Sequence, residues 1–133
     1  MIGYAEQEVF SDVEQALLVR ATQLVKLAPY EIDGEAVRCH ELARAVAAHL
    51  RLTVADGWFG MVDHSWCWCQ RFRPGFGPLP NILDVYAPGR LPQVMLVDSS
   101  STWLPRDYKL GDRRRDIRRP VIRRLFEMLG KAS

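Results

Sequence analysis

The hydrophobic pattern of residues 11–28 predicts a helix. Its apolar side chains fall on one helical face, which comprises Val13, Leu17, Ala21, Leu24 and Val25. Ser11 followed by Glu14 has the spacing of a capping box, in which each side chain bonds to the backbone N–H of the other residue. Pro29 cannot continue a helix, so we expect this one to end soon after Leu27.

Residues 31–52 carry a second helical pattern. Asp33 and Gly34 are plausible start signals. One face gathers Cys39, Leu42, Ala43, Val46 and Leu50. Cys39 is therefore expected near the front of this helix, pointing inward. His40 follows it directly and is expected to point about 100° away from it.

After Arg51 the pattern changes from helical to extended. Residues 52–60, 63–72, 81–87 and 93–98 read as strands, and the turn-rich residues 73–80 read as a loop. The connections are short, which favours antiparallel neighbours. Pro120 suits the first turn of a last helix, whose buried stripe is Val121, Leu125, Met128 and Leu129. The order predicts an α+β fold: N-terminal helices packed on an antiparallel sheet of about four strands, then a C-terminal helix.

Composition narrows the class of protein. A chain of 133 residues, 48% of them hydrophobic, suits a single domain spanning residues 1–133 with a real core. It has no run of about 18 apolar residues that could span a membrane. Residues 1–12 lack the basic start of a secretory signal, which predicts a cytoplasmic protein. Three cysteines without disulfide spacing predict reduced thiols, and nothing in the pattern calls for a cofactor.

The charge is uneven, although the net charge is only +2. Residues 106–124 contain nine of the eighteen basic residues against three acids, within a basic helical segment at 111–131. Such a run is most often a solvated helix face. The alternative is a site for an acidic protein or nucleic acid, formed by Arg113, Arg114, Arg115, Arg118 and Arg119.

The segment VDHSWCWC, residues 62–69, concentrates the reactive side chains. Along a strand, His64, Trp66 and Trp68 share one face, and Ser65, Cys67 and Cys69 share the other. A zinc site would combine the two cysteines with His64 and with Cys39 or His40. The opposite faces make such shared ligation awkward, so buried packing is the preferred role for both cysteines.

Asp84 lies within the apolar segment NILDVY, where a buried carboxylate needs a partner. If His64 and Asp84 face the same way, and the second helix covers that face, Cys39 joins them as nucleophile, with His64 as base and Asp84 as the residue orienting it. Trp66 would shield the pair from water. The ordinary alternatives are a buried cysteine, a satisfied core histidine, and an aspartate paired with arginine or backbone.

Residues 35–100 resemble the core of the transglutaminase-like group within the papain-like cysteine enzymes. The resemblance rests on a Cys-x-x-x-Ala pattern at Cys39 and Ala43, a His-x-Trp motif at residues 64–66, and an aspartate on a following strand. Ser65 replaces the usual alanine. The resemblance implies a triad of Cys39, His64 and an aspartate, either Asp84, which we prefer, or Asp98, although neither precedes the proline common in the family.

Three functions follow as hypotheses. The first is a cysteine-dependent acyl-transfer enzyme acting on an amide bond of a protein or peptide through a thioester, as a protease, amidase, deamidase or transglutaminase. The second is a non-catalytic module of the same fold that binds an acidic protein or nucleic acid through its Arg-rich segment. The third is a zinc-stabilised interaction domain.

Overall fold

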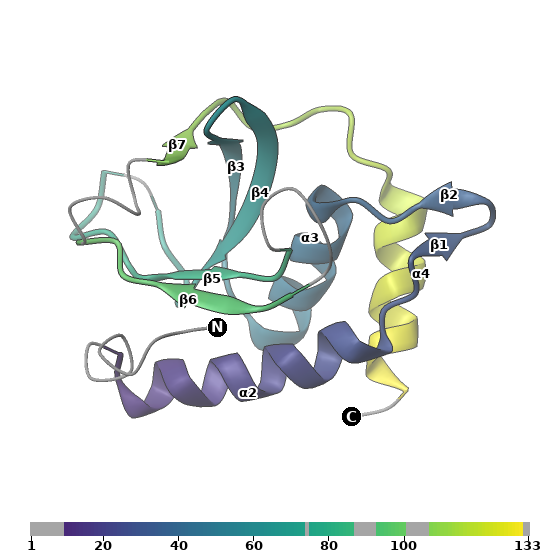
Figure 1. Ribbon diagram of the computed structural model, residues 1–133, viewed down its shortest axis with the longest axis horizontal. Coiled ribbons are helices and arrows are strands. Elements are labelled where there is room, and N and C mark those ends of the chain that lie inside the picture. The colour runs from purple at the N-terminus through teal and green to yellow at the C-terminus, as the bar shows by residue number, and fades with distance from the viewer. Residues whose placement is uncertain (1–9, 74, 87–92, 101–106, 132–133) are drawn as a thin grey trace.

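A computed structural model describes residues 10–73, 75–86, 93–100 and 107–131. This part of the chain has an α+β architecture with three helices and two antiparallel sheets (Figure 1). The elements are α2 (Asp12–Leu27), β1 (Glu31–Ile32), β2 (Glu35–Ala36), α3 (Cys39–Leu50), β3 (Val54–Phe59), β4 (Val62–Trp68), β5 (Ile82–Asp84), β6 (Met95–Val97), β7 (Tyr108–Leu110) and α4 (Arg119–Gly130).

Helix α2 begins and ends as the sequence predicts. The Ser11 N–H donates to Glu14 Oε1 at 2.8 Å, and the Glu14 N–H donates to Ser11 Oγ at 3.1 Å, which completes the capping box. Of the predicted face, Ala21, Leu24 and Val25 are buried. Val13 is 70% exposed, so the buried face of α2 begins after the first helical turn.

Helix α3 begins later than predicted, because Asp33 and Gly34 form a hairpin turn between β1 and β2. Their φ angles of 52° and 82° lie in the left-handed region that a two-residue hairpin of Asp-Gly type requires. The start signals were therefore turn residues, and that prediction was wrong. The consequence matters for function, since Cys39 becomes the first residue of α3.

The main sheet has the strand order β6-β5-β4-β3-β7, and every neighbouring pair is antiparallel. Three of these strands lie inside the predicted ranges, and β4 begins one residue before its range, at Val62. Residue 87 of the third predicted strand and residues 1–9 lie outside the described residues. The short strand β7 was not predicted. It packs closely against β3 at Gly57, where any Cβ would collide with the carbonyl of Lys109. A glycine in β3 is what admits this neighbour.

The helices cover one face of the sheet, and aromatic residues cover the other. Cys67, Cys69 and Leu83 pack with the helices in the larger core. Trp66, Trp68 and Tyr108 belong to a second core on the opposite face, with Ala55, Ile82 and Val97. Helix α3 therefore does not cover the face that carries His64 and Trp66, contrary to the expectation from sequence.

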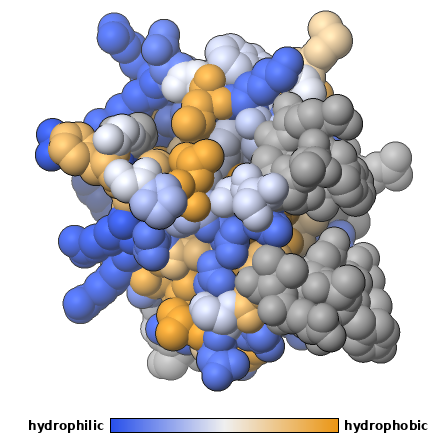
Figure 2. Space-filling model, turned by 90° about the vertical axis from the view of Figure 1, so that its left-hand side faces the viewer, coloured by the Kyte–Doolittle hydropathy of each residue, from blue (hydrophilic) through white to orange (hydrophobic). Residues whose placement is uncertain are grey.

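Helix α4 packs against α3, with Pro120 in its first turn. Val121, Leu125 and Leu129 are buried, as predicted, and Met128 is partly buried. No helix in the described part of the chain is both long and apolar enough to span a bilayer. On the face shown in Figure 2, hydrophobic residues are interspersed among hydrophilic ones.

Candidate active site

The Cys39 thiol lies where the sheet opens between β4 and β5. Strand β5 pairs with β4 only as far as Leu83. The N–H of Cys69 donates to the carbonyl of Asn81 at 2.9 Å, and N–H groups of alternate residues point to the same side of a strand. The N–H of Ser65 therefore points into the gap beyond Leu83, and there it bonds to the Cys39 sulfur instead of a strand partner.

Through this opening the thiol meets His64, although α3 packs on the other face. His64 Nε2 lies 2.7 Å from Asp84 Oδ2, and the ring is near enough to Cys39 for the thiol to raise the pKa of His64. Continuing the β4–β5 register places Asp84 opposite Trp66, so His64 is its diagonal neighbour on the same face. The sequence-predicted residues Cys39, His64 and Asp84 are thus brought together, with a hydrogen bond between His64 and Asp84 and the thiol beside them.

Asp84 is fully buried and its oxygens are satisfied by three donors. Besides His64, the Tyr108 hydroxyl donates to Oδ2 at 2.7 Å and the Tyr86 N–H donates to Oδ1 at 3.1 Å. A buried carboxylate with this many donors is held in one orientation. It can therefore fix the ring of His64 and favour its charged form.

The pKa values of Cys39 and His64 are displaced toward an ion pair. Burial raises the pKa of Cys39, but hydrogen bonds with His40, His64 and the Ser65 N–H lower it to about 6. Burial lowers the pKa of His64, but the hydrogen bonds and negative charge of Asp84 and Cys39 raise it to about 9. Between these values the favoured state is a thiolate beside an imidazolium.

A second imidazole touches the sulfur. His40 Nδ1 and Nε2 lie 3.6 and 3.9 Å from Cys39 Sγ, so the expectation that His40 points away from it was wrong. The Ser65 hydroxyl donates to Asp56 Oδ1 at 2.6 Å and so accepts from His40 Nδ1, 2.7 Å away. Asp56 in turn pairs with Arg44 at 2.6 Å. This chain of contacts turns the His40 ring toward the thiol.

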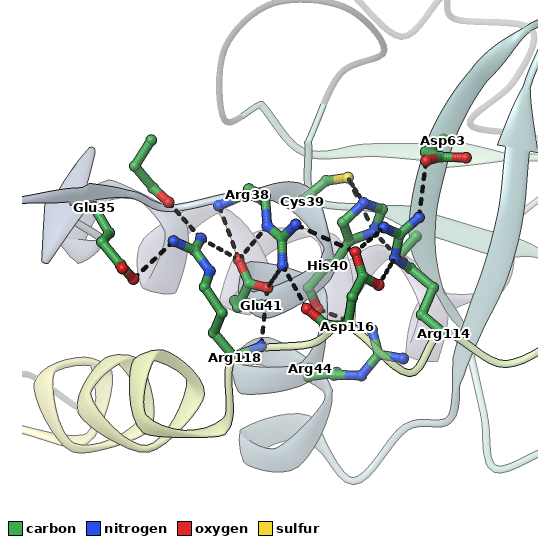
Figure 3. A network of polar contacts seen from close by, with 12 residues as sticks. Glu35, Arg38, Cys39, His40, Glu41, Arg44, Asp63, Arg114, Asp116 and Arg118 are labelled. Atoms are coloured by element: carbon green, nitrogen blue, oxygen red, sulfur yellow. Dashed lines mark hydrogen bonds and ion pairs between the residues drawn. The ribbon is translucent and has the colours of Figure 1, made fainter.

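The start of α3 is fixed by a buried carboxylate, Glu41, and by the segment that precedes α4 (Figure 3). Glu41 pairs with Arg38 and Arg118, each at 2.7 Å. Burial raises the pKa of Glu41, but the two arginines outweigh this effect and lower the pKa to about 2. Arg114 pairs with Asp63 and Asp116 at 3.1 and 2.6 Å. Residues 114–118 therefore connect α3, β4 and α4.

The remaining predicted residues lie in different places. Trp66 is fully buried, and its ring lies 6.0 Å from that of His64 between centroids, in the position expected for a shield. Asp98 accepts bonds from the backbone and hydroxyl of Ser100 and contacts no histidine among the described residues. Asp84 therefore lies behind His64, and Asp98 does not.

Cys67 and Cys69 are packed in the core. The Cys67 thiol donates to the carbonyl of Ala43 at 3.4 Å. Burial raises the pKa of both thiols, that of Cys69 to about 12. Within the described ranges, no group of three or more His, Cys, Asp or Glu residues is arranged to hold a metal ion.

Sequence reasoning missed two residues of this site, Asp56 and Tyr108, and set a third aside, His40, as pointing away from Cys39. Asp56 could have been suspected, since it is a charged residue in an apolar strand pattern, as Asp84 is. Tyr108 gave no signal because its strand was not recognised. His40 gave a misleading one, because an angle around a helix axis says where a side chain leaves the backbone and not where its ring ends.

The comparisons with known proteins add no relative. No family model matches the chain, and no curated protein or solved structure does so.

Proposed function

We propose that this protein is a cysteine-dependent acyl-transfer enzyme acting on an amide bond, with Cys39 as nucleophile, His64 as acid and base, and Asp84 as the residue orienting His64. One observation carries the proposal: a helix-terminal thiol lies close enough to the imidazole of His64 for each to shift the pKa of the other, and a buried carboxylate holds that imidazole. The resemblance of residues 35–100 to the transglutaminase-like group of papain-like enzymes points the same way, and we propose that fold for the chain.

The first half of the reaction transfers the acyl group to the enzyme. The Cys39 thiolate attacks the amide carbonyl carbon, and a C–S bond forms. The imidazolium of His64 gives its proton to the leaving amine as the C–N bond breaks. The products of this half are a free amine and a thioester on Cys39. The positive end of the α3 dipole stabilises the thiolate before the attack.

The second half releases the acyl group. Neutral His64 takes a proton from the acceptor, which is water in a hydrolase or an amine in a transglutaminase. The acceptor oxygen or nitrogen bonds to the acyl carbon, the C–S bond breaks, and the thiolate and imidazolium are restored. Asp84 keeps the ring in place in both halves through its bond to Nε2.

The proposal predicts a selectively reactive thiol. Iodoacetamide alkylation of the full chain, followed residue by residue by mass spectrometry across pH, is expected to show Cys39 reacting with a midpoint near pH 6. A free model thiol has its midpoint at about pH 8.5. Cys67 and Cys69 serve as internal controls. All three thiols are buried, but Cys67 and Cys69 are expected to react little near neutral pH because burial raises their pKa values.

The variant His64→Ala separates activation from exposure. It is expected to move the Cys39 midpoint upward, whereas Cys69→Ala is expected to leave it unchanged. A Cys39 midpoint like that of the model thiol in the wild-type protein would contradict the proposal. The non-catalytic module of the same fold would then be the better description.

A further inference from the structure

The arginines of the C-terminal segment divide into two groups. Arg114 and Arg118 are engaged by carboxylates within the fold. Arg113, Arg115 and Arg119 are exposed and have no carboxylate partner among the described residues, and all three line one cavity of about 690 Å³. Only these three arginines of the predicted acidic-partner site are therefore available to a partner.

The cavity adjoins a second, which in turn adjoins a third. It shares Arg113, Ile117 and Arg119 with a cavity of about 560 Å³ between α3, β3 and α4. That cavity shares Thr53 and Phe72 with a third, of about 520 Å³. We name the three together the arginine trough. Each part is large enough for several side chains and far larger than a single small anion needs.

The far end of the trough is also basic. Arg51, Arg71 and Arg73 line the third cavity, and none pairs with a carboxylate of the described chain. Asp56 is neutralised by Arg44, which leaves Asp112 as the one unpaired acid lining the trough in the described part of the chain. Six guanidinium groups without a carboxylate partner in the described chain, one of which (Arg73) lies over the Phe76 ring, line these adjoining cavities and form a strongly positive field that selects an anionic partner.

The floor of the trough is largely aliphatic. Val54, Leu110, Ile117 and Ile122 line the middle cavity. Trp68 is only 4% exposed and Phe72 packs against its edge, so the described lining offers one accessible aromatic ring. Single-stranded nucleic acid binds on several stacking platforms, whereas aliphatic side chains fit a peptide.

We propose that the arginine trough binds an acidic polypeptide segment in which apolar residues alternate with glutamate or aspartate. Carboxylates of the segment pair with the arginines at both ends, and its apolar side chains contact the aliphatic floor. The middle cavity reaches Asp56, which is linked through Ser65 to His40 beside Cys39. The further step, that the bound segment belongs to the substrate, rests on the proposed function.

Binding is measured by fluorescence anisotropy with the full chain and a labelled peptide that alternates Glu and Leu. The matched probe replaces every Glu by Gln, and an oligothymidylate of similar length is the third probe. The acidic peptide is expected to bind at least about tenfold tighter than the other two, with an affinity that falls as salt rises.

Two triple variants locate the site: R113Q/R115Q/R119Q and R51Q/R71Q/R73Q. Each is expected to weaken binding of the acidic peptide by about tenfold, which corresponds to the loss of three modest ion pairs. The control R20Q/K26Q/K131Q removes the same charge from exposed positions outside the trough and is expected to change the affinity less than about twofold. Thermal melts check that all variants fold.

Equal binding of the acidic and Gln peptides would overturn the proposal, as would tighter binding of the oligonucleotide or equal weakening by the control triple. The proposed enzyme function fails separately. A trough that binds the acidic peptide in a protein whose Cys39 titrates like a free thiol leaves the binding site standing and removes the catalysis. An activated Cys39 in a protein that does not select the acidic peptide leaves the proposed catalysis standing and removes the binding site.

Discussion

At the scale of the residue, the site is set by how many groups share one sulfur. Two imidazoles and the N–H of Ser65 lower the pKa of Cys39, and the His40 ring comes within 3.6 Å of the sulfur. After the opposing effect of burial, the bond with His40 is the largest of those that lower its pKa, ahead of that with His64. Such a thiol differs from one paired with a single histidine, because neither ring alone accounts for the stability of the thiolate.

We therefore predict that His40→Ala raises the alkylation midpoint of Cys39 by about one pH unit while His64 is intact. The variant His40→Asn is expected to keep the hydrogen bond to Ser65 and the stability of the fold, yet still raise the midpoint, since an amide carries no charge. The measurement is the pH profile of iodoacetamide alkylation. His49→Asn is the matched control, because His49 contacts Phe126 on α4 and not the sulfur. Unchanged midpoints in both His40 variants would show that this ring has only a packing role.

The sequence indicated residue identity better than residue geometry. Cys39, His64 and Asp84 could be chosen because each is a reactive side chain in an apolar periodic pattern. The way in which the three residues meet could not be predicted, because it depends on where the pairing of β4 with β5 ends. That end is set by tertiary packing around the start of α3, and the alternation of side chains along a strand gives no information about it.

At the scale of the element, the first turn of α3 is held by its neighbours. Glu41 is completely buried in that turn and accepts the Arg38 N–H as well as two guanidinium groups. Arg118 lies directly before α4, so the same carboxylate joins the start of α3 to the start of α4. Because Cys39 is two residues away, loss of this anchor should displace the thiol.

We predict that Glu41→Gln destabilises the protein by about 2–3 kcal/mol in urea unfolding at neutral pH, since it leaves two guanidinium groups without their shared carboxylate. The folded-state pKa of about 2 lies below the usual 4.5, so the ionised form contributes stability above pH 4.5. That contribution is lost as pH falls from 4.5 toward 2. The wild-type and Gln variant should therefore converge in stability at acid pH.

A difference in stability between the two proteins that stays constant from pH 7 to 3 would contradict this account. Glu127→Gln, an exposed site on α4, is the control.

Elements with a strong local period were predicted correctly, and those without one were not. Helices α2 and α4 followed from their apolar faces, the capping box and Pro120. The β1–β2 hairpin was misread because Asp-Gly fits both a helix start and a tight turn, and the choice falls to pairing between β1 and β2. Strand β7 has three residues and is defined by its contact with β3, which no local pattern encodes.

At the scale of the whole molecule, the two titrations of the site offset each other. Between about pH 6.5 and 9, the folded protein has a Cys39 thiolate and a protonated His64, and so holds one proton on the pair. The unfolded chain also holds one, on the thiol, because its histidine is neutral. Stability depends on pH only through the difference in bound protons, so the pair contributes almost no slope in this range.

Removing the thiol should make the free energy of unfolding depend on pH, because the proton on His64 is then no longer offset by the loss of one from Cys39. In Cys39→Ala the folded protein still protonates His64 beside Asp84, and the unfolded chain does not above about pH 6.5. A folded pKa raised above its unfolded value gives stability that is lost as pH rises through the folded pKa. Relative to wild type, the variant is therefore expected to lose up to about 1.4 kcal/mol per pH unit above pH 6.5, measured by urea unfolding. Cys69→Ala, which removes a thiol that stays protonated when folded, is expected to show no such slope. Wild-type stability that falls above pH 6.5 with the same slope as Cys39→Ala would mean that Cys39 keeps its proton beside a charged His64, and the proposed nucleophile would lose its activation.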